Sequence, residues 1–161
     1  MSQTRQLTTI AMFVAIGIIG AQFLWFPAGV AKAYPVQHMV NVLAAVLLGP
    51  FPAVLIAFLT SLLRVMLGLG TVVAFPGSII GAFLAGMLYK HFGRKFLAMS
   101  GEIVGTGVFG SLFSVPIANL VMGSSLGVLA FLPSFLVSSI SGAILGYVVV
   151  VRVNHTYLQN S

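Results

Sequence analysis

The sequence contains almost no negative charge, since Glu102 is the only carboxylate among its 161 residues. It also contains no cysteine, which excludes disulfides and thiolate metal sites. Charged residues make up 5% of the chain, whereas soluble globular domains typically carry about a quarter. A soluble fold of this composition would have too little polar surface, so lipid is the expected solvent. The sequence therefore predicts an integral membrane protein.

Motifs for catalysis and nucleotide binding are missing as well. There is no Walker A loop, so the chain is not expected to power transport with ATP by itself. There is no HExxH motif, no pair of carboxylates and no Gly-x-Ser-x-Gly turn, and one carboxylate cannot hold the metal of a lipid-headgroup transferase. We therefore expect no enzyme activity, no cofactor and no metal site. A small binding subunit and a channel-like or structural protein remain as alternatives.

Hydrophobic residues make up 60% of the chain, and the length suffices for about six spans of about 20 residues each. The predicted fold class is all-α: a single membrane domain over residues 1–161, built as a compact bundle of six transmembrane helices. Residues 27–37 contain two prolines and a glycine, and they predict a structured outward loop. The predicted helices are residues 7–26, 38–48, 52–68, 75–91, 97–122 and 126–151.

Positive charges are distributed unevenly over the expected helix ends. Because cytoplasmic loops of membrane proteins carry an excess of Lys and Arg, the charge-rich side is expected in the cytoplasm, together with both termini. Lys32 and Arg64 then fall on or towards the outer side. The expected location is the bacterial cytoplasmic membrane. The charge-rich side holds five of the seven Lys and Arg residues: Arg5, Lys90, Arg94, Lys95 and Arg152.

Small residues recur at every fourth position in several predicted helices. Such rows lie on one helix face and let two helices approach closely. In the last three helices they favour packing inside the bundle. In the first helix, Ala11 and Ala15 form such a row. For this row, packing within the bundle and docking of a partner membrane protein both remain open.

Polar side chains within the apolar segments cost free energy, which makes each a candidate for ligand binding. Gln37, His38 and Asn41 form the densest group, and their spacing places them on neighbouring positions of one helix. The group is either a helix end solvated by lipid headgroups or part of a binding site. Arg64 lies within about two turns of an outer helix end, where it snorkels, pairs or lines a wet cavity.

Other candidates lie near the expected outer side. Ser78 and Asn119 offer hydrogen bonds, and Trp25 and Phe75 offer aromatic faces for a flat ligand. The usual enrichment of aromatic residues at the membrane interface explains the positions of Trp25 and Phe75 equally well. Glu102 is expected near the cytoplasmic end of its helix, where it pairs with a nearby cation or contacts a partner. That position is far from the outer polar group, so no direct ligand role is expected for Glu102.

Two stretches carry a family resemblance. Residues 26–50, which read FPAGVAKAYPVQHMVNVLAAVLLGP, resemble the substrate-binding S components of energy-coupling factor vitamin transporters. Arg64, the string FPGS at residues 75–78 and the pair Gly81-Ala82 look like the ThiW group within that family. The resemblance covers about residues 5–152.

The resemblance implies that ligand binding and energy supply are carried out by different proteins. S components have six helices, bind one vitamin or precursor near the outer face, and dock on a membrane coupling protein driven by two cytosolic ATPases. An Ala-x-x-x-Ala pattern on their first helix contacts the coupling protein, and Ala11 and Ala15 match it. The whole S component is thought to topple in the membrane to deliver its ligand, and residues 27–37 match a loop that caps the site.

ThiW-like members are associated with hydroxyethylthiazole, the thiazole precursor of thiamin. A flat, neutral heteroaromatic ligand suits an outer site that offers aromatic faces and amide or imidazole groups but no carboxylate. The cationic thiamin would prefer a nearby acid. The alternatives are an S component for a pyrimidine or another small aromatic vitamin, and a stand-alone facilitator or channel. The candidate substrate-binding residues are Trp25, Gln37, His38, Asn41, Arg64, Phe75, Ser78 and Asn119.

Overall fold

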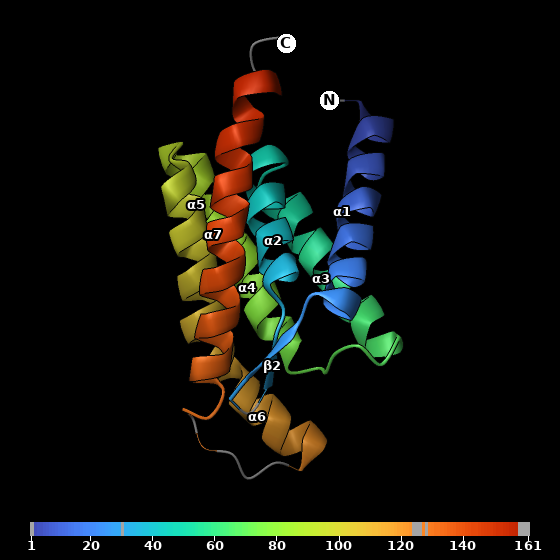
Figure 1. The fold of residues 1–161 in the computed structure, drawn as a ribbon, viewed down its shortest axis with the longest axis vertical. Coiled ribbons are helices and arrows are strands. Elements are labelled where there is room, and N and C mark those ends of the chain that lie inside the picture. Colours follow the sequence, from blue (N-terminus) through green and yellow to red (C-terminus); the bar gives the residue numbers. More distant parts are fainter. Residues whose placement is uncertain (1, 30, 124–126, 128, 158–161) are drawn as a thin grey trace.

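A computed structural model describes residues 2–29, 31–123, 127 and 129–157, and it describes side chains as far as residue 153. The chain folds into a bundle of helices with one short β-hairpin (Figure 1). The described elements are α1 Gln3–Phe23, β1 Phe26–Ala28, β2 Ala31–Ala33, α2 Pro35–Leu47, α3 Pro50–Met66, α4 Ala74–Phe92, α5 Lys95–Glu102, the π-helix η1 Ile103–Gly110, α6 Ser111–Met122 and α7 Leu132–Tyr157.

The composition and lengths of the helices suit a multi-pass membrane protein. In the part of the chain that the structure describes, three helices are long and apolar enough to cross a bilayer: Gln3–Phe23, Lys95–Met122 and Leu132–Val153. Pro35–Leu47 and Pro50–Met66 are apolar but shorter. Large apolar side chains such as Leu120 and Phe23 are exposed on the outside, which is stable when the surroundings are lipid.

Residues 27–37 do form a structured connection, and the structure shows that it is a β-hairpin followed by a helix start. β1 and β2 pair antiparallel, with Phe26 opposite Ala33. Pro35 occupies the first turn of α2, where its missing N–H is not needed and its fixed φ favours the helix. α2 therefore begins inside the stretch expected to be loop, which lengthens a segment that looked short for a membrane helix.

Several helix ends differ from the expected ones. α1 ends at Phe23 rather than Phe26, because Phe26 begins β1. The turn between α2 and α3 lies at Leu48 and Gly49, and α3 ends at Met66. α7 begins at Leu132, and the expected start at residue 126 lies outside the described residues.

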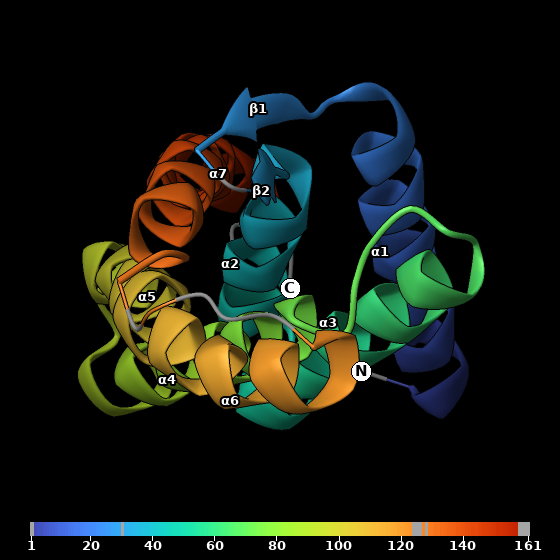
Figure 2. The same ribbon diagram turned by 90° about the horizontal axis from the view of Figure 1, so that it is seen from below.

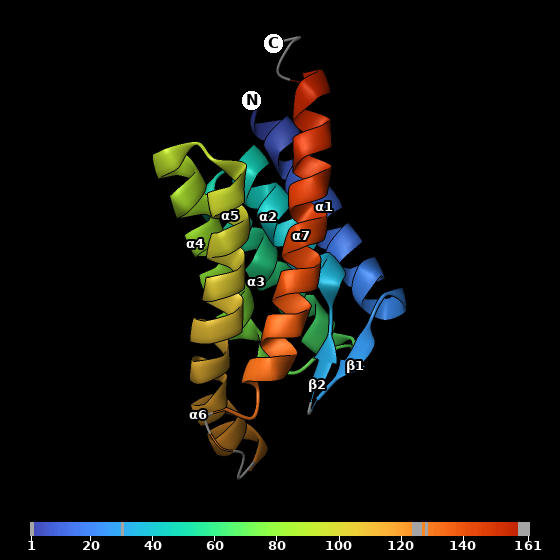
Figure 3. The same ribbon diagram turned by 60° about the vertical axis from the view of Figure 1, so that its left-hand side comes forward.

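The helix predicted over residues 97–122 is one continuous column with a change of winding in its middle. α5 passes into the π-helix η1 and then into α6, as Figure 3 shows. Pro116 lies inside α6 and removes a backbone donor there. π-helical turns inside α-helices are rare and occur frequently at functional sites. Here Glu102, the last residue of α5, and Thr106 of η1 are both buried inside the bundle.

The centre of the bundle is packed with small residues. α2 packs against α7, α4 and α3, and alanines such as Ala44, Ala57 and Ala82 are fully buried. A Cβ on Gly105 of η1 would lie 2.6 Å from the Cα of Gly81 in α4. The rows of small residues therefore allow close approach of backbones, as their spacing predicted.

The two ends of the bundle differ in character. Both termini lie at one end, and the hairpin, α6 and the connection between α3 and α4 lie at the other (Figure 1). Viewed from this second end, the hairpin lies between α1 and α7, and α6 runs across the opposite side (Figure 2). We call this second end the hairpin end.

Candidate ligand-binding site

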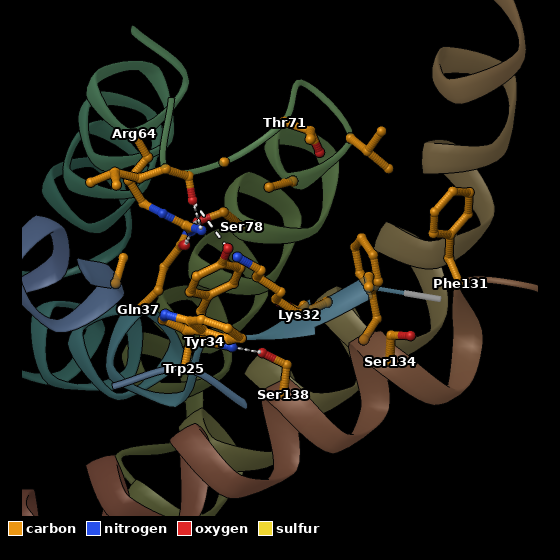
Figure 4. A pocket seen from close by; sticks show the side chains of 18 of the residues that line it. Trp25, Lys32, Tyr34, Gln37, Arg64, Thr71, Ser78, Phe131, Ser134 and Ser138 are labelled. Carbon is orange, nitrogen blue, oxygen red and sulfur yellow. Dashed lines mark hydrogen bonds between the residues drawn. The ribbon is translucent and has the colours of Figure 1, made fainter. Parts of the chain in front are cut away.

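A pocket of about 650 Å³ opens at the hairpin end of the bundle. Its wall includes the end of α1, the hairpin, the first turns of α2, the segment between α3 and α4, and the start of α7. Figure 4 shows that side chains from these separate elements point towards one space. The lining residues with polar or aromatic side chains are Gln22, Trp25, Lys32, Tyr34, Gln37, His38, Arg64, Thr71, Ser78, Thr106, Phe131, Ser134, Phe135 and Ser138.

Two cations of the pocket wall lie over aromatic rings. The Nζ atom of Lys32 lies 3.9 Å from the ring centroid of Trp25, and the Cζ atom of Arg64 lies 3.8 Å from that of Tyr34. Cation–π contacts of this kind are stronger where water is excluded. They fix both the rings and the charges at the wall of the pocket.

Tyr34 ties the hairpin to the rest of the bundle. Its backbone N–H donates to Ser138 Oγ on α7 at 2.8 Å, and its hydroxyl donates to the Leu69 carbonyl at 3.1 Å. Nη2 of Arg64 donates to the same carbonyl at 3.2 Å. The side chain of Ser134 donates to the Ala28 carbonyl in β1. These bonds hold the hairpin and the segment after α3 against each other across the pocket.

Gln37 connects Arg64 to serine side chains of α3 and α4 through hydrogen bonds. Nη1 of Arg64 donates to Gln37 Oε1. The amide of Gln37 donates to Ser61 Oγ at 3.1 Å and to Ser78 Oγ at 2.8 Å. All four side chains are buried, so each bond replaces solvation that the bilayer interior cannot supply.

Glu102 accepts hydrogen bonds from three neighbours through one oxygen. Oε1 lies 2.8 Å from His38 Nδ1, 3.0 Å from Asn41 Nδ2 and 3.0 Å from Thr106 Oγ1. The other oxygen, Oε2, has no partner among the described residues. It faces Gly81, where an added Cβ would lie 2.6 Å away. Glycine at this position leaves the space that the carboxylate occupies.

The two groups form one continuous polar network. Asn41 Nδ2 lies 3.4 Å from Ser78 Oγ and 3.0 Å from Glu102 Oε1, and Ser78 also receives the amide of Gln37. The network therefore runs from a buried cation, Arg64, to a buried carboxylate. We use "polar network" for Gln37, His38, Asn41, Ser61, Arg64, Ser78, Glu102 and Thr106.

The structure brings most of the candidate site residues together. Trp25, Gln37, His38, Arg64 and Ser78 line the pocket. Asn41 lies behind them, 1% exposed, and bonds to Ser78 and Glu102 instead of facing the pocket. The group expected from the spacing at 37–41 is therefore a buried network and not a helix end solvated by headgroups.

Two candidates lie elsewhere. Phe75 packs edge-on against Phe58, with ring centroids 5.7 Å apart, and it does not line the pocket. Asn119 is exposed on α6, and the α6 residues that line the pocket are Ala118 and Met122. Proximity along the chain to an outer helix end did not reveal which helix face turns inward.

The expected position and pairing of Glu102 were wrong. It forms no hydrogen bond or ion pair with Arg94, Lys95 or Arg152 but is fully buried beside His38 and Asn41. Glu102 was expected near the end of the bundle that holds the termini. Because α5 already starts at Lys95, Glu102 lies about two helical turns further into the bundle. Arg64 is 1% exposed, so it pairs within the bundle and does not snorkel.

Residues 7–156 match the family described as thiamine-precursor transporter protein (ThiW). The chain belongs to the ThiW family of thiamine-precursor transporters. No curated protein matches the chain. The family membership makes the pocket at the hairpin end the first candidate for the site of the transported precursor, because it is a deep concave site with aromatic and polar side chains.

Several lining residues of this ThiW-family chain are not among the eight candidate substrate-binding residues. Thr106 and Ser138 lie in predicted helices, where serine and threonine side chains often form hydrogen bonds with the backbone of their own helix. Their presence there does not by itself indicate a ligand. Lys32 and Tyr34 were visible as loop residues, but a hairpin that folds back over the bundle was not. Phe131 precedes α7 and closes the far side of the pocket.

Ala11 and Ala15 are exposed on α1, away from the pocket. They belong to a shallow, wholly apolar groove between α1 and α3, lined by Leu7, Ile10, Ala11, Val14, Ala15, Ile18, Leu55, Leu59 and Leu63. The row of small residues on α1 is therefore not used for packing inside this chain.

Replacing Gln37 by leucine tests the polar network. We expect Gln37→Leu to lower the free energy of unfolding by about 1–3 kcal/mol, because it removes the acceptor of Arg64 Nη1 and the amide that donates to Ser61 and Ser78 in a buried place. Thermal unfolding of the detergent-purified chain would measure the effect. Gln22→Leu is the control, because Gln22 lines the same pocket but is exposed. Equal stability of the two variants would contradict the described network.

Proposed function

We propose that this ThiW-family chain is the substrate-binding subunit of an energy-coupling factor importer and that its ligand is hydroxyethylthiazole. The observation that carries the proposal is the pocket at the hairpin end. Its volume of about 650 Å³ lies within the usual range of small-molecule sites, about 300–1,000 Å³. Its wall combines aromatic rings with a few fixed polar groups, as sites for flat heteroaromatic ligands do.

The charge of the wall supports a thiazole rather than thiamin itself. Lys32 and Arg64 line the pocket, and no carboxylate does so among the described residues. Glu102, the only carboxylate of the chain, is fully buried behind His38. A cationic ligand would meet two positive charges without a facing acid, whereas a neutral thiazole alcohol has no such penalty. Trp25 and Tyr34 offer ring faces, and Gln37, His38 and Ser78 offer hydrogen bonds.

The proposed membrane arrangement places both termini in the cytoplasm and the hairpin end outside. The end with the termini also carries Lys90, Arg94 and Lys95, at the junction of α4 and α5, which agrees with the excess of positive charge on the cytoplasmic side of membrane proteins. The chain lacks an ATP-binding loop, so import against a gradient requires cytosolic ATPases and a membrane coupling protein. The proposed docking surface for that coupling protein is the apolar groove with Ala11 and Ala15.

Titration of the detergent-purified chain tests the ligand. Trp25 is the only tryptophan and lines the pocket, so we expect hydroxyethylthiazole to change its fluorescence saturably. Hydroxymethylpyrimidine and thiamin should bind at least about tenfold more weakly. The pyrimidine has a different shape, and thiamin carries a positive charge. Preference for the pyrimidine or for thiamin would overturn the proposed substrate and leave a binding subunit for a different precursor.

A matched pair of histidine variants accompanies the titration. His38→Ala removes a side chain of the pocket wall and should weaken binding, whereas His91→Ala changes an exposed residue at the far end of α4 and should not. Equal affinities of the two variants for the thiazole would place the ligand outside the pocket.

A large side chain introduced on α1 tests the proposed docking surface. Ala15→Trp should leave thiazole binding unchanged and abolish ATP-driven uptake in liposomes that contain the coupling protein and ATPases, because it fills a groove that needs a small residue. Val148→Trp is the control, since Val148 is exposed on α7 and belongs to another face. Uptake by liposomes that hold this chain alone would instead support a facilitator and contradict the proposed role as a subunit.

A further inference from the structure

The charges of the polar network balance without His38. Arg64 and Glu102 are both at most 1% exposed, and Gln37, Ser78 and Asn41 connect them. One cation therefore offsets one carboxylate inside the bundle. An imidazolium at His38 would add a second buried cation with no further carboxylate in the chain to compensate it. A neutral His38 is the form that keeps this balance.

In the neutral form, the hydrogen bond between His38 and Glu102 determines which ring nitrogen carries the single proton. An ionised carboxylate only accepts hydrogen bonds. Oε1 of Glu102 lies 2.8 Å from Nδ1 of His38, so Nδ1 carries the proton and donates it. A neutral imidazole protonated on one nitrogen has a lone pair on the other. Nε2 of His38 is therefore a hydrogen-bond acceptor.

With Nδ1 on Glu102, Nε2 is the ring nitrogen that is left for a ligand. His38 is one of the residues that line the pocket, and Nε2 forms no hydrogen bond with a described residue. The side chain of His38 is 9% exposed, whereas that of Glu102 is fully buried. The other charged groups of the wall, Lys32 and Arg64, are donors only. In its neutral form, His38 thus adds an acceptor to a pocket wall that also holds two cationic donors.

We propose that Glu102 is a positioning residue that holds His38 with Nε2 as an acceptor for the hydroxyl proton of the ligand, so that the site selects heteroaromatic alcohols. The inference rests on the proposed function, in which the ligand is a thiazole with a hydroxyethyl group. Glu102 itself does not touch the ligand. The methyl ether of hydroxyethylthiazole keeps the ring and the side-chain oxygen but has no proton to donate, so the site binds it more weakly than the alcohol.

The tautomer can be observed without any ligand. In the full chain labelled with ¹⁵N-histidine and held in detergent, the His38 signals are assigned by comparison with the His38→Gln variant. The expected spectrum has a protonated Nδ1 and an unprotonated Nε2. Addition of hydroxyethylthiazole should then shift the Nε2 signal towards that of a hydrogen-bonded acceptor. A protonated Nε2 in the ligand-free chain, in either the other tautomer or the imidazolium, would overturn the inference.

The second measurement compares the affinities of the alcohol and its methyl ether. The wild-type chain should bind the alcohol about tenfold more tightly, the value of one well-formed hydrogen bond. Glu102→Gln introduces an amide that can donate to Nδ1 and so move the ring proton to Nε2, which should bring the ratio of the two affinities close to one. Glu102→Asp keeps a carboxylate and should restore part of the preference.

The ratio of the affinities for alcohol and ether distinguishes a positioning role of Glu102 from a purely structural one. If Glu102 only stabilised the fold, Glu102→Gln would weaken both ligands equally and leave the ratio unchanged, which contradicts the inference. Should this variant not fold, His38→Phe serves in its place and should also bring the ratio to one. Equal binding of alcohol and ether by the wild-type chain overturns the inference and leaves the proposed function standing. If neither binds, the proposed function fails, and the histidine spectrum alone decides the inference.

Discussion

The structure depends on a polar network that joins one buried arginine to one buried carboxylate within an otherwise apolar bundle. Arg64 and Glu102 are each at most 1% exposed, and a buried charge whose opposite charge is removed is poorly solvated by the interior. Gln37, Ser78 and Asn41 connect the two through amide and hydroxyl groups. The connection joins α2, α3, α4 and the α5–η1 junction, so it also specifies how these elements are arranged around the pocket.

Composition and pattern were sufficient for the general architecture and for part of the site. The low charge and the apolar segments predicted a helical membrane protein, and the spacing of Gln37, His38 and Asn41 predicted that they act together. The sequence could not place Glu102, because its depth depends on where α5 begins and on the π-helical winding of η1. Phe75 and Asn119 were misplaced for a related reason: a mostly apolar helix has no clear inward face, so its polar or aromatic residues do not reveal its rotation.

The same arrangement explains how a small chain can provide a selective site. The hairpin is held across the pocket by Tyr34, whose ring lies under Arg64 and whose backbone bonds to α7. The ligand would therefore meet a wall whose rings and donors are fixed before it arrives, which reduces the entropy lost on binding. The close packing of Gly81 against η1 leaves the carboxylate of Glu102 just enough room to hold His38. Family membership and pocket chemistry point in the same direction, towards the binding of a thiamin precursor.

A double-mutant cycle of Arg64→Met and Glu102→Gln, read as thermal stability of the purified chain in detergent, tests the central claim most directly. Each single variant leaves one buried charge uncompensated and should lose about 3–5 kcal/mol of stability. The double variant removes both charges, so its loss should be smaller than the sum of the single losses by more than about 0.5 kcal/mol. Additive losses would mean that the two charges do not compensate each other, and they would contradict the account of the network given above.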